Sequence, residues 1–161
     1  MGNVTKEGVI RLLSDYPDML RKRDILKYEM EHPALLSDEE MLESMSYLRG
    51  DGSGIHSGGV SDRTYYIAMV YREKAEALNK DSRNDIARRL LPLEREIERL
   101  EFYLAHLTEQ EREAVRNCFF KGMSVRDAAN AMGVSLWTLR KLRGGAVEQL
   151  VKMYLVAENG D

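Results

Sequence analysis

Large apolar residues recur between residues 86 and 107 at alternating steps of four and three. Such a heptad repeat places all of its members on one face of an α-helix. Charged residues on the flanks, such as Glu94 and Arg99, keep the neighbouring faces polar. The repeat predicts a long helix whose apolar seam is covered in one of two ways: by a second copy of the chain, as a coiled-coil homodimer, or by antiparallel packing against the preceding helix. The seam residues are Ile86, Leu90, Leu93, Ile97, Leu100, Leu104 and Leu107.

Helical periodicity also dominates the rest of the chain, and the alternation typical of a half-buried strand is almost absent. We therefore expect an all-α fold. Thr5 is placed to cap a first helix, and Pro17 lies where a second helix begins, which runs to about residue 32. Ser37 and Glu40 have the spacing of a capping box that opens a further short helix. The residues expected to face inward on that short helix are Met41, Leu42, Met45 and Leu48.

These patterns divide the chain into an N-terminal helical segment (1–49), a linker (50–61), a long helical region (62–106) and a C-terminal domain (107–157). Five glycines between residues 50 and 59 make regular structure costly in the linker. This segment lacks the Gly-Lys-Ser/Thr ending of a phosphate-binding loop, so we interpret it as a connector. Asp62 is placed to cap the long helical region. Pro92 lies inside the seam, where it removes a backbone donor, so we expect a kink or a helix break there.

The sequence favours a protein with no membrane-spanning segment and no internal disulfide. Hydrophobic residues make up 43% of the chain, but no run reaches the ~18 to 20 apolar residues that span a bilayer. The first residues lack the apolar stretch of a secretion signal, so we expect a cytoplasmic location. The single cysteine, Cys118, lies in an apolar run and is interpreted as a packed thiol.

Sequence patterns typical of catalysis are missing. His32, His56 and His106 are widely separated, and none of them belongs to a metal-ligand spacing. No Gly-x-Ser-x-Gly elbow is present. We therefore predict a protein that is not an enzyme and that binds no metal and no cofactor.

The C-terminal domain contains the pattern of a helix-turn-helix, in which two helices cross closely around a tight turn. Ala129 supplies a small residue at the crossing, and Gly133 can adopt the left-handed conformation of the turn. Ser135 can cap the second helix. Residues expected to face inward are Val125, Ala128, Met132, Val134, Leu139 and Leu142; those expected to face outward are Leu136, Trp137, Arg140, Lys141 and Gly144.

Residues 107–135 resemble, without gaps, region four of bacterial RNA polymerase sigma factors. The similarity continues through residues 138–143 and then at Ala146, Val147 and Leu150. In that family the second helix reads the upstream element of a promoter. The resemblance therefore implies double-stranded DNA and RNA polymerase as partners, with Leu136 and Trp137 among the residues that face bases or phosphates.

Charge and side-chain chemistry support DNA as the partner of this domain. The whole chain has a net charge of -3, but residues 121–152 hold six basic and two acidic residues. Arg140 can pair with a guanine edge, Lys141 can reach a guanine or a phosphate, and Trp137 can pack on a thymine methyl or a sugar. An alternative for Trp137 is a core or interface aromatic. The residues predicted to bind DNA are Arg126, Ser135, Leu136, Trp137, Thr138, Arg140, Lys141 and Arg143, with Lys121 as a further phosphate contact.

Two departures from the sigma-factor pattern bear on these expectations. Residues 1–106 do not resemble the regions with which sigma factors open a promoter. Gly144 and Gly145 lie inside the expected second helix, where each glycine costs about 1 kcal/mol relative to alanine, so we expect the helix to end or bend there. The order of the segments is also similar to that of small phage regulators of late genes, of the ArpU and RinA type.

Together these observations predict N-terminal helices, a long heptad helical region and a C-terminal helix-turn-helix domain. The predicted function is sequence-specific transcription regulation of phage or prophage origin, acting with RNA polymerase. An alternative is a DNA-binding adaptor in phage packaging or recombination, in which the helices build an oligomer.

Overall fold

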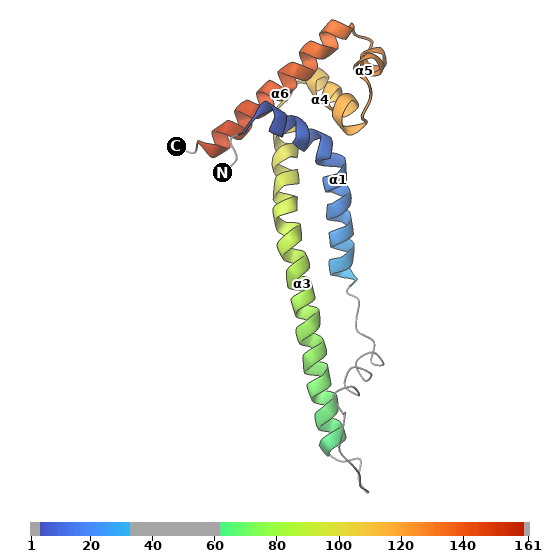
Figure 1. Ribbon diagram of the computed structural model, residues 1–161, viewed down its shortest axis with the longest axis vertical. Coiled ribbons are helices and arrows are strands. Elements are labelled where there is room, and N and C mark those ends of the chain that lie inside the picture. Colours follow the sequence, from blue (N-terminus) through green and yellow to red (C-terminus); the bar gives the residue numbers. More distant parts are fainter. Residues whose placement is uncertain (1–3, 33–61, 160–161) are drawn as a thin grey trace. The chain divides into compact units, whose positions relative to one another are not determined.

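The computed structural model describes residues 4–32 and 62–159, and all regular structure in these two ranges is helical (Figure 1). The predicted all-α fold is therefore confirmed. The short helix expected after Ser37 and the linker at 50–61 lie outside the described residues. The elements are α1 (Lys6–Glu31), α3 (Asp62–Ala105), α4 (Glu109–Val115), the π-helical turn η1 (Arg116–Phe120), α5 (Val125–Met132) and α6 (Leu136–Glu158).

The chain forms two compact units. The first consists of Met1–Asp24 together with Leu91–Asp161, and the second consists of Ile25–Leu90. In the second unit, Leu26 and Leu90 are buried. In the first unit, residues of α1 and α3 share a core with residues of α4, η1 and α6.

Helix α1 begins as the sequence predicts but continues further. The Gly8 amide donates a hydrogen bond to Thr5 Oγ1 at 3.0 Å, so Thr5 caps the helix. The prediction that a second helix starts at Pro17 is wrong, since Pro17 lies inside one helix of 26 residues. A proline in this position removes one backbone hydrogen bond, but burial of Val9 and Leu13 in the turns before it holds the helix against its core.

Helix α3 is likewise continuous, so the break considered at Pro92 does not occur. Apolar residues are buried on both sides of this proline, with Leu90 before it and Ile97 and Leu100 after it. Their burial offsets the lost hydrogen bond. Within the described residues, no helix is long and apolar enough to cross a membrane.

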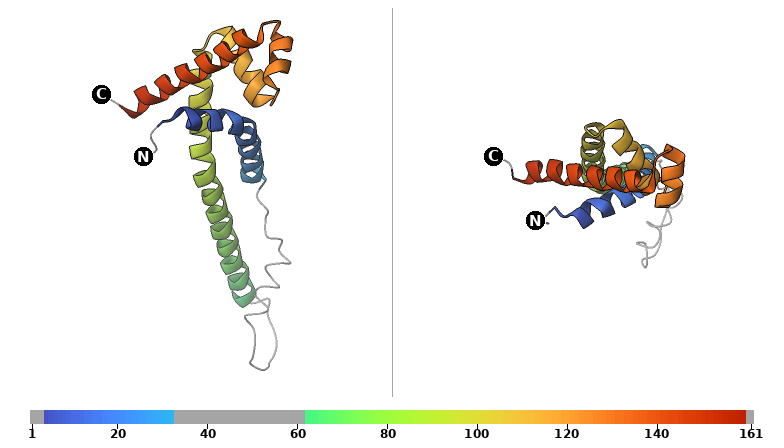
Figure 2. Two further views of the ribbon diagram at one scale, coloured as in Figure 1. Left: turned by 45° about the horizontal axis from the view of Figure 1, so that its top comes forward. Right: turned by 90° about the horizontal axis from the view of Figure 1, so that it is seen from above.

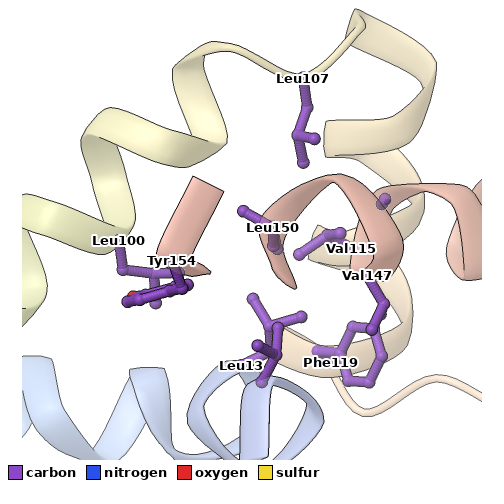
Figure 3. Close-up of a cluster of buried hydrophobic side chains, with 10 residues drawn as sticks. Leu13, Leu100, Leu107, Val115, Phe119, Val147, Leu150 and Tyr154 are labelled. Atoms are coloured by element: carbon purple, nitrogen blue, oxygen red, sulfur yellow. The ribbon is translucent and has the colours of Figure 1, made fainter. Parts of the chain in front are cut away.

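The main core of the first unit joins residues from five elements, α1, α3, α4, η1 and α6, and Figure 3 shows this cluster. It includes Leu100 and Leu107 of the heptad seam. This end of the seam is therefore covered by the chain itself, including the α1 residues Val9 and Leu13. The other members of the core are Val115, Phe119, Ala146, Val147, Leu150 and Tyr154.

Helices α4 and α5 both pack against α6 (Figure 2). Helix α6 takes part in two cores. Leu139 near its beginning belongs to a small core with Ala114, Ala128 and Ala129, and Leu150 further along belongs to the main core. The position of α6 is thus fixed along most of its length.

Candidate nucleic-acid interface

The connection between α5 and α6 has the geometry predicted for a helix-turn-helix. Gly133 ends α5 in the left-handed conformation, with φ 65° and ψ 31°. Its amide donates to the Asn130 carbonyl at 3.2 Å, and the Val134 amide donates to the Ala129 carbonyl at 3.0 Å. These bonds satisfy the last carbonyls of α5 and turn the chain sharply.

Serine caps fix the beginning of both helices. Ser124 Oγ accepts a hydrogen bond from the Asp127 amide at 3.1 Å, and Ser135 Oγ accepts one from the Thr138 amide at 3.0 Å. Ser135 Oγ also lies 2.8 Å from Thr138 Oγ1. The cap predicted at Ser135 is confirmed. The hydroxyls of Ser135 and Thr138 already interact with each other at the beginning of α6.

Small residues allow α4, α5 and α6 to approach one another closely. Ala114, Ala128, Ala129 and Leu139 form the buried centre of the module. All six residues expected to face inward belong to this centre or pack against it. The partly buried residues around it are Cys118, Met123, Val125, Met132, Val134, Leu136 and Leu142.

Three of the predicted DNA-binding residues form an exposed face on the first turns of α6. Trp137, with 68% of its surface exposed, lies with exposed Arg140 and Lys141 on the side of α6 opposite Leu139. Because Trp137 is exposed, it does not fill the core of this chain. On α5, Arg126 is exposed as well, and so is Lys121 just before that helix.

The aromatic ring and the ammonium group of this face are in contact. Lys141 Nζ lies over the Trp137 ring, 4.9 Å from its centroid. Such a cation–π contact at an exposed site contributes about 0.5–1 kcal/mol. The ring therefore restricts the lysine, and the pair presents a cation beside a flat apolar surface.

Two other predicted residues are placed differently. Leu136, expected to face outward, is half-buried and packs against the small core, since the first residue of α6 turns toward α5. The guanidinium of Arg143 lies over Phe119 of η1, with its carbon 4.9 Å from the ring centroid. Arg143 thus links α6 to η1, an interaction that sequence spacing could not predict because the partner is 24 positions away.

The same guanidinium lies close to the single cysteine. Burial raises the pKa of the Cys118 thiol, and the charge of Arg143 partly offsets this effect. The interpretation of Cys118 as a packed thiol agrees with its contacts, because it packs against both cores.

The helix end or bend expected at Gly144 and Gly145 is not observed, since α6 continues to Glu158. Burial explains the continuity: Ala146, Val147 and Leu150 follow directly and are buried. A methyl group on Gly145 would lie 3.6 Å from the Glu111 carboxylate, so this glycine packs near the beginning of α4.

One local feature that sequence reasoning missed sits at that beginning of α4. Thr108 Oγ1 accepts from the Glu111 amide, and the Glu111 carboxylate accepts from the Thr108 amide at 3.0 Å. The Thr-x-x-Glu spacing was the available signal for this capping box. In the described part of the chain, no group of three or more acidic, histidine or cysteine residues is arranged to hold a metal ion.

Residues 103–152 match the family model for sigma-70 region 4. The match begins near the end of α3, ends within α6 and includes the whole helix-turn-helix. The chain therefore carries a DNA-binding helix-turn-helix module of the kind found in transcription regulators. No match is found among curated proteins, and none among solved structures.

Proposed function

We propose that the chain is a sequence-specific transcription regulator of phage or prophage origin that acts with RNA polymerase. The observation that supports this proposal best is the exposed face of Trp137, Arg140 and Lys141 on a helix whose position is fixed by two cores. A rigid helix with an exposed basic face at its N-terminal end suits entry into the major groove.

Each residue of this face has a distinct role in the proposal. Arg140 pairs with a guanine edge through its planar guanidinium. Lys141, held over the Trp137 ring, contacts a guanine or a phosphate, and the ring packs on a thymine methyl. Arg126 and Lys121 contact phosphates, which orients the module without reading sequence.

The other four predicted residues on or next to α6, Ser135, Leu136, Thr138 and Arg143, contribute indirectly. Ser135 and Thr138 fix the first turn of α6, and Leu136 anchors it to the small core. Arg143 holds α6 against η1 through Phe119. These four residues therefore position the reading face, and their backbone or aliphatic atoms contribute any contact they make with DNA.

The test begins with selection from random duplexes by the purified chain, followed by titration of the selected duplex. Trp137 is the only tryptophan, so its fluorescence reports directly on the proposed face. Arg140→Ala should weaken binding to the selected duplex by ~1 to 3 kcal/mol and relax the preference at one base pair. Arg11→Ala, an exposed change on α1, is the matched control and should leave binding unchanged.

Two results would contradict the proposal. One is equal, weak binding to every duplex; the other is a selected duplex whose affinity does not depend on Arg140. The polymerase part is tested separately, by transcription in vitro from a promoter containing the selected sequence. If added chain changes transcript yield equally with and without that sequence, the proposed regulation is wrong.

A further inference from the structure

Within the first unit, helix α3 exposes two large apolar residues on the side opposite the heptad seam. Leu91 is 55% exposed and Phe102 is 63% exposed. Phe102 follows Leu91 by eleven positions, about three turns, so the two side chains project from the same face. Arg95 and Glu98 lie between them on this face, and both are exposed.

The order of these four residues is self-complementary. Leu91 lies four positions before Arg95, and Phe102 lies four positions after Glu98. If two copies of α3 pack antiparallel about a two-fold axis between Arg95 and Glu98, Arg95 of each copy meets Glu98 of the other. The same axis places Leu91 of each copy opposite Phe102 of the other, so every contact occurs twice.

A parallel arrangement of the same face is unfavourable. It would place Arg95 against Arg95 and Glu98 against Glu98, and like charges in contact repel. The charge order therefore selects the antiparallel two-fold pair over the parallel one.

The apolar surface around Phe102 is wider than one helix. Beside it lies an open apolar hollow of about 300 Å³. In the two-fold arrangement, Leu91 of the second copy approaches this end of the face, so the hollow offers it more apolar surface than Phe102 alone. The hollow is lined by Phe102, Tyr103, His106, Met153, Val156 and Ala157.

We propose that this face of α3, defined by Leu91, Arg95, Glu98 and Phe102, is a homodimer interface in which two copies pack antiparallel. The interface differs from the heptad seam, whose residues Leu100 and Leu107 are covered by the chain's own core. Each dimer holds two helix-turn-helix modules. A protein of this kind suits a DNA site with two half-sites related by symmetry.

The test is sedimentation equilibrium of the full chain without DNA, so the result does not depend on the function of the module. The parent chain should show a monomer–dimer equilibrium. Arg95→Glu alone and Glu98→Arg alone should each weaken association by roughly tenfold or more, because each creates two like-charge contacts. The double variant Arg95→Glu/Glu98→Arg should restore association to within about threefold of the parent, because the charges are exchanged and again complementary.

Matched controls separate this interface from others. Arg11→Glu makes the same charge change at an exposed position of α1 and should leave association unchanged. Phe102→Ala should weaken association while helix content, measured by circular dichroism, stays the same. A chain that is monomeric at ~100 μM, a dimer that none of these changes affects, or a double variant no better than the singles would each overturn the proposal.

Discussion

Gly133 offers a sharp test of the turn, because its contribution is purely conformational. Its φ of 65° is a region that residues with a side chain rarely adopt, and a methyl group added there would meet nothing within 4 Å. A left-handed conformation costs an ordinary residue roughly 1–2 kcal/mol. Alanine also restricts the unfolded chain, which returns about 0.4–1 kcal/mol. We expect Gly133→Ala to lower the free energy of unfolding by about 1 kcal/mol.

Gly144 is the matched control, because the same chemical change should have the opposite sign there. It lies inside α6 in helical conformation, and an added methyl group also meets nothing within 4 Å. Alanine should therefore stabilise the helix by about 0.5–1 kcal/mol.

Urea denaturation followed by circular dichroism measures both changes. In a chain of this size, 1 kcal/mol corresponds to a shift in melting temperature of about 2–4 °C. Gly133→Asn should fall between the parent and the alanine variant, since asparagine tolerates the left-handed region better than alanine. A Gly133→Ala variant as stable as the parent, or two alanine variants that shift stability in the same direction, would contradict a conformational role for Gly133.

Three further predictions concern the cap, the small core and one tyrosine. Ser135→Ala should lower the free energy of unfolding by about 1 kcal/mol, because the Thr138 amide loses its hydrogen-bond acceptor. Ser135→Asp should retain most of the parent's stability, because aspartate can also cap the helix, and thermal denaturation compares the two variants. Leu139→Ala removes a fully buried side chain and should cost about 2–5 kcal/mol in urea denaturation, while exposed Lys141→Ala should cost less than 1 kcal/mol. Burial and a 2.7 Å hydrogen bond to Glu101 raise the pKa of Tyr16 to about 12, above its value of about 10 in an unfolded chain. The neutral tyrosine therefore stabilises the fold fully below about pH 10, and this contribution is lost as the pH rises toward 12. The free energy of unfolding, measured across that pH range, should depend less steeply on pH in Tyr16→Phe than in the parent. An unchanged pH dependence would argue against the hydrogen bond.

Local chemistry explains which parts of the structure could be predicted from sequence. The caps at Thr5 and Ser135 and the turn at Gly133 depend on a few adjacent residues, so their spacing alone identifies them. The small core of the module follows from helical periodicity in the same way. The exposed face of Trp137, Arg140 and Lys141 was predicted as well, although its DNA contacts stay a prediction.

Distant packing explains what sequence reasoning missed. Pro17, Pro92 and Gly144 all indicated interruptions, yet each lies in a continuous helix, because the burial of neighbouring apolar residues outweighs a cost of a few kcal/mol. The contact between Arg143 and Phe119 likewise depends on packing between α6 and η1. Such contacts join residues far apart in sequence, which no local pattern records.

The sharing of α6 between two cores has a mechanical consequence. One end of this helix carries the basic face, and the other end is clamped by the beginning of the chain through residues such as Val9 and Leu13. A continuous helix of 23 residues is a stiff lever of about 34 Å. A displacement of α1 at one end would therefore tilt the exposed face of Trp137, Arg140 and Lys141 at the other, so the position of the first helix sets the orientation of that face.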